Sequence, residues 1–225
     1  VCHNGEINTL QGNINWMRAR EADLAGADVW GEDAAVLAPV IGPHGSDSAK
    51  FDNALDLLVQ SGRDIRHAMM MLVPKAWERA ADVTPAQRAF YRYQRCLQEP
   101  WDGPAALTFS DGAVVGCLLD RNGLRPARFV ILDDGVVIVS SEAGAVDVDE
   151  ARVVQKGRLR PGEMLAVDTT TGRVENDAAI VARFIQQQPY AAWLDAHMVT
   201  LDDVKWQRDA AVRGPGAPLP PAAPL

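Results

Sequence analysis

The feature that most constrains this fold is a change in the spacing of apolar residues near the middle of the chain. Over the first ~100 residues, apolar side chains recur every three or four positions, which is typical of amphipathic helices. The next ~75 residues hold short apolar runs of strand length, joined by tight-turn signals. Because helices and strands come in separate blocks rather than in alternation, the sequence predicts an α+β fold.

The first three predicted helices have stop signals of their own. A glycine can adopt the left-handed conformation that closes a helix, and a proline cannot continue one. The helices are expected over residues 10–24, 48–61 and 65–72, with stops at Gly26, Gly62 and Pro74.

A fourth helix has the clearest start. Thr84 can cap it, Pro85 suits its first turn, and Gln87 completes a capping box. The helix should stop before Pro100, and a last helix should begin after Asp177. On the fourth helix, the side chains expected to face inward are those of Phe90, Tyr93 and Leu97.

Three strand pairs are predicted in the strand block. Their turns lie at Asp111-Gly112, at Asp134-Gly135 and near Gly172. The runs on either side of these turns are almost continuously apolar rather than alternating. That pattern indicates sheets that are covered on both faces.

Charge and composition exclude several kinds of partner. The 225 residues carry 22 Lys and Arg against 30 Asp and Glu, a net charge of -8, which argues against nucleic acid or an anionic membrane. No apolar run approaches the ~18 residues of a membrane span. The cysteines share no CxxC spacing and the histidines are scattered, so we expect no metal site and a reducing, cytoplasmic location. Cys96 and Cys117 are expected in the core.

The segment "HNGE" near the start of the chain is the first candidate site. The Asn4 amide and the bare backbone N–H of Gly5 could together stabilise an oxyanion, although Asn-Gly by itself favours a plain turn. Cys2 and His3 are reactive residue types. However, neighbours in an extended chain point to opposite faces, which argues against a nucleophile–base pair.

Two further segments carry charge in suggestive places. Asp47 lies between two serines just before a helix, where a carboxylate could cap the helix or bind a ligand's ammonium group. In "LLDRNGLRPARF", three arginines surround Asn122-Gly123, which suggests either an anion site or a buried ion pair with Asp120. There is no glycine-rich phosphate loop. By contrast, the isolated His67 on a Met-rich helix indicates core packing.

Taken together, these segments are more specific than any one of them alone. The chain resembles the amidotransferase domain of the glutamate synthase large subunit, from about residue 1 to residue 194. The motifs that carry the resemblance, in order, are "HNGEINTLQGNINWMRARE", "GSDSAKFDNALDLL", "GRDIRHAMMMLVPKAWE", "FYRYQ", "EPWDGPAAL", "LDRNGLRPARF" and "KGRLRPGEMLAVDT".

The resemblance implies a class II glutamine amidotransferase with a four-layer αββα sandwich, the N-terminal nucleophile hydrolase fold. Such a domain hydrolyses L-glutamine to glutamate and ammonia for the reductive amination of 2-oxoglutarate, a step in ammonia assimilation and glutamate biosynthesis. The implied cofactors, FMN and an iron–sulfur cluster, belong to downstream domains. The implied partners are the remaining synthase domains and a small NADPH-oxidising subunit, and the electron donor stays open between NADPH and ferredoxin.

The resemblance also implies roles for individual residues. Asn4 and Gly5 match the oxyanion hole, and Asp47 matches the carboxylate that binds the α-ammonium group of glutamine. The family's nucleophilic cysteine lies far upstream of "HNGE", so we expect a fragment that lacks its N-terminal part and is inactive alone. Residues 1–203 are expected to form the C-terminal part of the amidotransferase domain. The Pro- and Ala-rich residues 204–225 are expected to be disordered.

Two other interpretations stay open at this level. One is another class II amidotransferase, such as the purine-pathway phosphoribosyltransferase relatives. The other is a regulatory or interaction module on a catalytically dead amidotransferase fold. A third and plainer interpretation treats Asn4-Gly5 as a turn and Asp47 as a cap, with no site at all.

Overall fold

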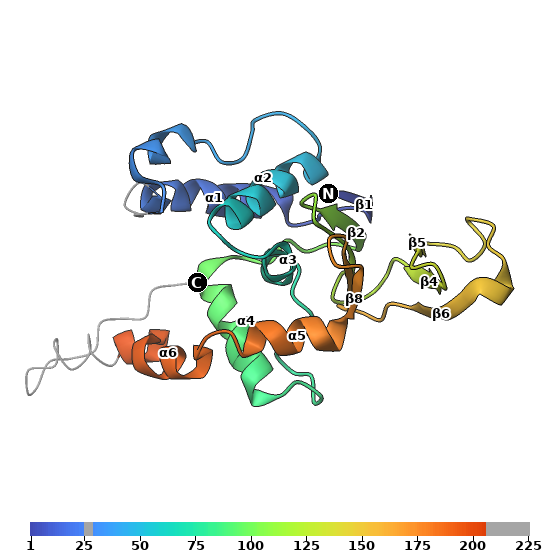
Figure 1. Ribbon diagram of the computed structural model, residues 1–225. Helices are drawn as coiled ribbons and strands as arrows, with labels where there is room; N and C mark the ends of the chain where they lie inside the picture. The colour runs from blue at the N-terminus through green and yellow to red at the C-terminus, as the bar shows by residue number, and fades with distance from the viewer. Residues whose placement is uncertain (25–28, 206–225) are drawn as a thin grey trace, which may run out of the picture.

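The computed structural model describes residues 1–24 and 29–205, which form two antiparallel sheets and a layer of helices (Figure 1). The helices are α1 (Leu10–Leu24), α2 (Asp47–Gln60), α3 (Ile65–Leu72), α4 (Pro85–Leu97), α5 (Asp177–Ile185) and α6 (Tyr190–His197), with 3-10 turns at Gly31–Val36 and Glu150–Arg152. The strands are β1 (Cys2–Gly5), β2 (Ala105–Ser110), β3 (Val114–Leu119), β4 (Arg128–Leu132), β5 (Val137–Ser140), β6 (Val153–Arg158), β7 (Met164–Asp168) and β8 (Arg173–Asn176).

The large sheet has five strands in the order β1-β2-β3-β7-β8, and the small sheet has three in the order β5-β4-β6. All neighbouring strands are antiparallel. The hairpins β2–β3, β4–β5 and β7–β8 contain the predicted turns, with Gly112, Gly135 and Gly172 all at positive φ. The predicted hairpins are therefore confirmed, whereas strand β6 had no signal that we recognised.

Side chains alternate between the two faces of the large sheet, and each face has its own apolar cluster. On β2 and β3, Leu107 and Leu118 pack into the main core with helices α1 to α6. Cys117 and Leu119 point to the other face, where they pack against Phe129 of the small sheet. The described residues thus form three layers, with helices on one side of the large sheet and the small sheet on the other, as Figure 1 shows.

This mixed architecture agrees with the predicted α+β class, while the four-layer arrangement stays a prediction. Within the described part of the chain, the large sheet is covered on both faces, as expected. The small sheet is not: five of the six residues of β6 are exposed, and Val154 retains 69% of its accessible surface. The expectation that every sheet is covered is wrong for these residues.

The predicted start of α4 is confirmed in detail. The Thr84 hydroxyl accepts the Gln87 N–H at 3.2 Å, and the Gln87 amide oxygen accepts the Thr84 N–H at 2.8 Å. The predicted inward face is only partly right, because Phe90 is buried and Tyr93 packs partly buried against the core, whereas Leu97 is 38% exposed. The apolar stripe therefore ends one turn before the helix does.

Three other expectations concern chain segments and cysteines. Cys117 is buried as predicted, but Cys96 is exposed on α4, so its assignment to the core is wrong. The predicted stop at Gly26 lies outside the described residues. So does the predicted disordered tail beyond residue 205.

Candidate functional site

Strand β1 carries the "HNG" segment at one edge of the large sheet. Within the described residues it pairs with β2 alone, and Asn4 lies opposite Ala106 while Gly5 lies opposite Ala105. Cys2 and Asn4 therefore share the face that looks toward the small sheet, and His3 and Gly5 share the helix-covered face. The segment is an edge strand rather than an isolated turn.

Gly5 allows an unusually close approach of two backbone segments. Its φ is +133°, and a Cβ at this position would lie 1.8 Å from the carbonyl oxygen of Pro104. Gly103 is constrained in the same way, because a Cβ at this position would lie 1.9 Å from the carbonyl oxygen of Glu6, the residue that follows β1. Only glycine fits at either place.

The hydrogen-bond alternation of the ladder directs the Gly5 N–H away from β2. The Glu6 N–H donates to the Pro104 carbonyl at 3.3 Å. In an antiparallel ladder, only alternate residues bond to a given partner strand, so Asn4 and Glu6 bond toward β2. The N–H groups of His3 and Gly5 then point to the open edge. A backbone donor is thus available beside the Asn4 side chain.

Asn4 also borders a cavity between the two sheets. The cavity has a volume of about 290 Å³. Its lining includes Cys2, Asn4, Thr108, Cys117, Ala127 and Ser140. Asn4 is exposed. Its side-chain amide can therefore contact a ligand in this cavity with no rearrangement of the hydrophobic core.

Asp47 reaches the same strand from the other face. Its Oδ2 accepts the Ile7 N–H at 3.1 Å and lies 3.2 Å from His3 Nε2, while its Oδ1 accepts the Ser48 N–H at 2.8 Å. Partial burial by itself would raise the pKa of the Asp47 carboxyl. The two backbone hydrogen bonds and the neighbouring His3 outweigh that effect and lower the pKa below its ordinary value. The group is a carboxylate at neutral pH.

The structure separates the functions that the sequence left open for Asp47. The cap of α2 is Ser46, whose hydroxyl accepts the Ala49 N–H at 3.2 Å, so Asp47 is the first residue of the helix and not its cap. Its carboxylate instead accepts the Ile7 N–H, and this hydrogen bond connects the start of α2 to the residues after Gly5. His3 is the member of this group that sequence reasoning missed. The alternation of β1 was the signal that could have placed it near Asp47.

Cys2 and His3 do point to opposite faces, as predicted. The Cys2 thiol lies 2.7 Å from the Thr108 hydroxyl on the small-sheet side, whereas His3 faces Asp47. The two side chains therefore do not form a nucleophile–base pair.

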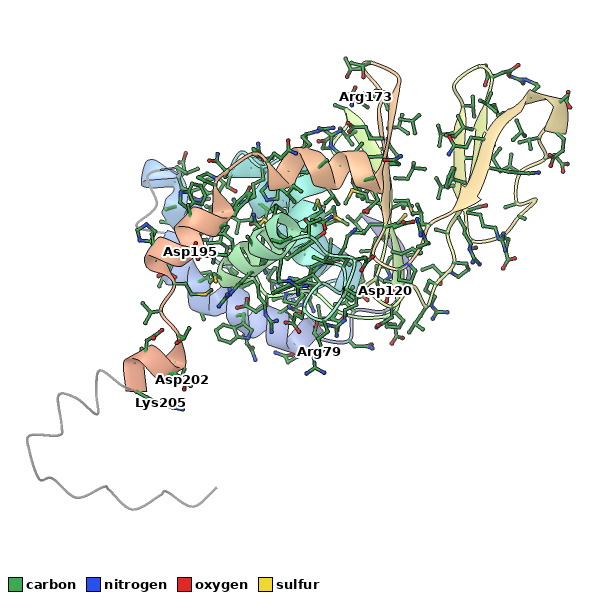
Figure 2. The ribbon with its side chains drawn as sticks, turned by 90° about the horizontal axis from the view of Figure 1, so that it is seen from below. Arg79, Asp120, Arg173, Asp195, Asp202 and Lys205 are labelled. Atoms are coloured by element: carbon green, nitrogen blue, oxygen red, sulfur yellow. The ribbon has the colours of Figure 1, made fainter. Side chains whose placement is uncertain are left out.

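The "DRNGLRP" segment follows β3, and its acidic residue has no ion-pair partner among the residues that the structure describes. Asp120 is 2% exposed, and its carboxylate accepts the backbone N–H groups of Ala105 at 3.2 Å and Asn122 at 2.9 Å. Figure 2 shows Asp120 close to the connection that leads toward the small sheet. Arg121 pairs instead with Asp102. Among the described residues, the expected ion pair with Asp120 is therefore wrong.

The remaining candidates are structural in the part of the chain that the structure describes. His67 is 9% exposed and packs between Phe90 and Phe184, with ring centroids 5.4 and 5.2 Å away, as the packing interpretation predicted. Within residues 1–24 and 29–205, no group of three His, Cys, Asp or Glu side chains could hold a metal ion. No helix there is long and apolar enough to span a bilayer.

Comparison with known proteins identifies the family of the chain. Residues 1–193 match the family model of class II glutamine amidotransferases. The chain is 44% identical over 202 residues to the glutamate synthase [NADPH] large chain of Bacillus subtilis, and this match covers 90% of the chain and 13% of that protein. It is 45% identical to the glutamate synthase [NADH] of Schizosaccharomyces pombe over 205 residues, 91% of the chain and 10% of the relative.

A plant relative gives the same result. The ferredoxin-dependent glutamate synthase 1 of Arabidopsis thaliana is 46% identical over 208 residues, which cover 91% of the chain and 13% of that protein. The chain thus spans about a tenth of the length of these relatives. It belongs to the class II glutamine amidotransferases and is homologous to the glutaminase domains of glutamate synthases.

Proposed function

We propose that this chain is part of the glutaminase domain of a glutamate synthase and supplies the oxyanion hole for the hydrolysis of L-glutamine. The observation that carries the proposal is the open edge of β1. There the Gly5 N–H points away from β2, and the neighbouring Asn4 amide borders a cavity. Two adjacent donors of this kind stabilise the negative charge that develops when an amide carbon is attacked.

The attacking group in this proposal comes from outside the described site. A cysteine thiol adds to the side-chain amide carbon of glutamine, with the cysteine's own α-amino group taking the thiol proton and passing it to the leaving nitrogen. Ammonia departs, a glutamyl thioester remains, and water releases glutamate and restores the thiol. Cys2 does not fit this role. Cys2 lies on β1, the strand that leads into Asn4 and Gly5, and its thiol contacts Thr108 on the neighbouring strand β2.

Asp47 is proposed to bind the α-ammonium group of glutamine. Its lowered pKa keeps it ionised, and its side chain is 26% exposed, so the carboxylate can accept an additional partner. Asp47 and Asn4 lie on opposite faces of β1. We therefore infer that glutamine lies across the open edge of the strand.

Ammonia release from glutamine tests the catalytic proposal. We expect no turnover by the chain alone, and turnover when it is joined to an upstream segment that begins with a cysteine. In the active protein, Asn4→Ala should lower kcat by about 10²- to 10³-fold with little change in KM. Asn122→Ala is the matched control, because it removes the other Asn-Gly amide. Comparable turnover by the chain alone, or equal losses in the two variants, would refute the proposal.

A second comparison tests the role of Asp47 against a purely structural one. Ser46→Ala removes the real cap of α2 and should cost about 1 kcal/mol of stability without changing KM. Asp47→Ala should raise KM for glutamine as well. If Asp47→Ala lowers stability but leaves KM unchanged, Asp47 only braces β1 against α2, and its substrate role is wrong.

The wider activity extends beyond these residues. We propose that the ammonia serves the reductive amination of 2-oxoglutarate in other domains, that these domains hold FMN and an iron–sulfur cluster, and that the location is the cytoplasm. Free cysteines at positions 2, 96 and 117 support a reducing compartment. We also propose the four-layer sandwich for the complete domain, because the outer face of the small sheet is largely exposed in the described residues.

A further inference from the structure

Four arginines gather where two loops meet beside the small sheet. Arg125 lies in the loop between β3 and β4 and Arg128 is the first residue of β4, whereas Arg158 is the last residue of β6 and Arg160 lies in the loop between β6 and β7. They line one cavity of about 320 Å³, together with Leu124 and Leu159. All four arginines are exposed, so their guanidinium groups are open to a partner. We call these four residues the arginine face.

The arginine face contains a like-charge pair that the described chain does not neutralise. Arg128 on β4 lies directly opposite Arg158 on β6 in the antiparallel ladder. Like charges in this position destabilise a sheet. Among the described residues, no carboxylate lies within salt-bridge distance of Arg125, Arg128 or Arg158, and only Arg160 has an acidic partner, Glu163 at 3.0 Å. A local excess of positive charge therefore persists on a chain of net charge -8.

The two loops have a common sequence and a common anchor. Each contains Leu-Arg-Pro, at residues 124–126 and 159–161. The N–H groups of Gly123 and Gly162 both donate to the carbonyl oxygen of Asp120, at 3.0 and 2.9 Å. The buried residue Asp120 thus hydrogen-bonds to both loops, and a proline restricts the backbone of each. The backbone positions of the arginines are therefore well defined.

We propose that the arginine face is a docking surface for a carboxylate-rich polypeptide segment. Guanidinium forks match carboxylates with two parallel hydrogen bonds, and arginine is enriched in protein interfaces. Leu124, which is 67% exposed on the same cavity, offers an apolar contact beside the charges. Such a mixed surface fits an acidic segment that also carries an apolar side chain. The proposal does not depend on the glutaminase chemistry.

The observations favour a polypeptide over other anions. A site built for a small anion would bury its charged groups, whereas these guanidinium groups are exposed along a loop pair and two strands. The acidic net charge of the chain repels any polyanion, and it repels nucleic acid most strongly because each nucleotide carries a phosphate charge. A protein segment can place several carboxylates at the spacing of the arginines.

The test uses the full chain and a fluorescein-labelled peptide of about 12 Glu and Leu residues, with binding followed by fluorescence anisotropy. Binding should weaken as NaCl rises from about 50 to 150 mM, because exposed charges are screened. Arg125→Gln/Arg158→Gln should weaken it by about tenfold or more, since two charge-assisted contacts are lost. The matched control is Arg79→Gln/Arg92→Gln, which makes the same charge change at exposed arginines elsewhere; Figure 2 labels Arg79.

The outcomes separate the possible explanations. Loss of binding in the first double variant, with the control unchanged and both variants folded by circular dichroism, supports the proposal. Equal weakening of peptide binding in both double variants would contradict the proposal, because binding would then depend on the overall charge of the chain and not on the arginine face. Absence of binding, or stronger competition by a single-stranded oligonucleotide or inorganic phosphate than by unlabelled peptide, would overturn the assignment of an acidic polypeptide.

Discussion

Replacing Glu175 should destabilise this chain more than replacing the arginine at the rim of the same ion cluster. Glu175 lies in β8 and is 2% exposed. Its Oε2 accepts Arg66 Nη1 at 2.6 Å, and its Oε1 contacts Arg183. Because Arg66 is itself 7% exposed, this is a buried ion pair that joins α3 to the large sheet.

The expected loss of stability in each variant depends on which buried charge is left without a partner. Removing one member of a buried pair costs about 3–5 kcal/mol, since the other charge stays buried without compensation. Arg66 keeps Asp64, which accepts its Nε at 2.8 Å and its Nη2 at 2.5 Å. We therefore expect Glu175→Gln to cost about 3 kcal/mol, at the lower end of that range. Arg183 is 38% exposed, so Arg183→Gln should cost no more than about 1 kcal/mol.

Urea unfolding at pH 7, followed by tryptophan fluorescence, measures these differences. A third variant, Arg66→Met/Glu175→Leu, removes both charges and should recover most of the loss, because no isolated charge remains in the core. The reasoning would be refuted if Glu175→Gln cost less than about 1 kcal/mol, or if the double variant were as unstable as the single one.

Three further predictions concern local features. Asp47 has a lowered pKa in the folded chain, so its stabilisation is fully present above the ordinary carboxyl pKa and is lost as pH falls from there through the lowered pKa. Asp47→Asn should therefore show a weaker loss of urea resistance between about pH 5 and 3 than the parent chain. Burial, and secondarily the charge of Arg63, lower the pKa of His67 to about 4. Because the unfolded chain then binds a proton more readily than the folded one, stability should fall as pH drops from about 6.5 toward 4, and His67→Phe should remove that dependence. Thr84→Ala should cost about 1 kcal/mol in the same unfolding assay, by loss of the α4 cap.

The features that sequence alone predicted are those decided by neighbours in the chain. The Thr84 cap involves residues three apart, and the tight turns at Gly112 and Gly135 are also local. The motifs of the family point to Asn4 and Asp47 as site residues, and these roles stay predictions. The α+β class followed from the block pattern of the sequence, because that pattern reflects which faces are buried.

The predictions that failed depended on distant contacts. Ser46 and Asp47 are both good capping residues, and the choice between them is settled by the Ile7 N–H, 40 residues away in the chain. Cys96 is apolar enough for a core, yet it lies on the outward side of α4, where nothing packs over it among the described residues. Helical spacing gives the period of a buried stripe but not where along the helix it ends.

Gly5 at the end of β1 and Gly103 just before β2 also limit how this part of the chain can vary in sequence. Each meets a backbone carbonyl oxygen, Gly5 that of Pro104 and Gly103 that of Glu6, rather than a side chain that could be trimmed. A second-site substitution therefore cannot make room for a larger residue at either position. In a library that varies both positions together, selection for folding should return glycine at both. Mutational tolerance beside Asn4 is thus set by the main chain, whatever chemistry the neighbouring side chains perform.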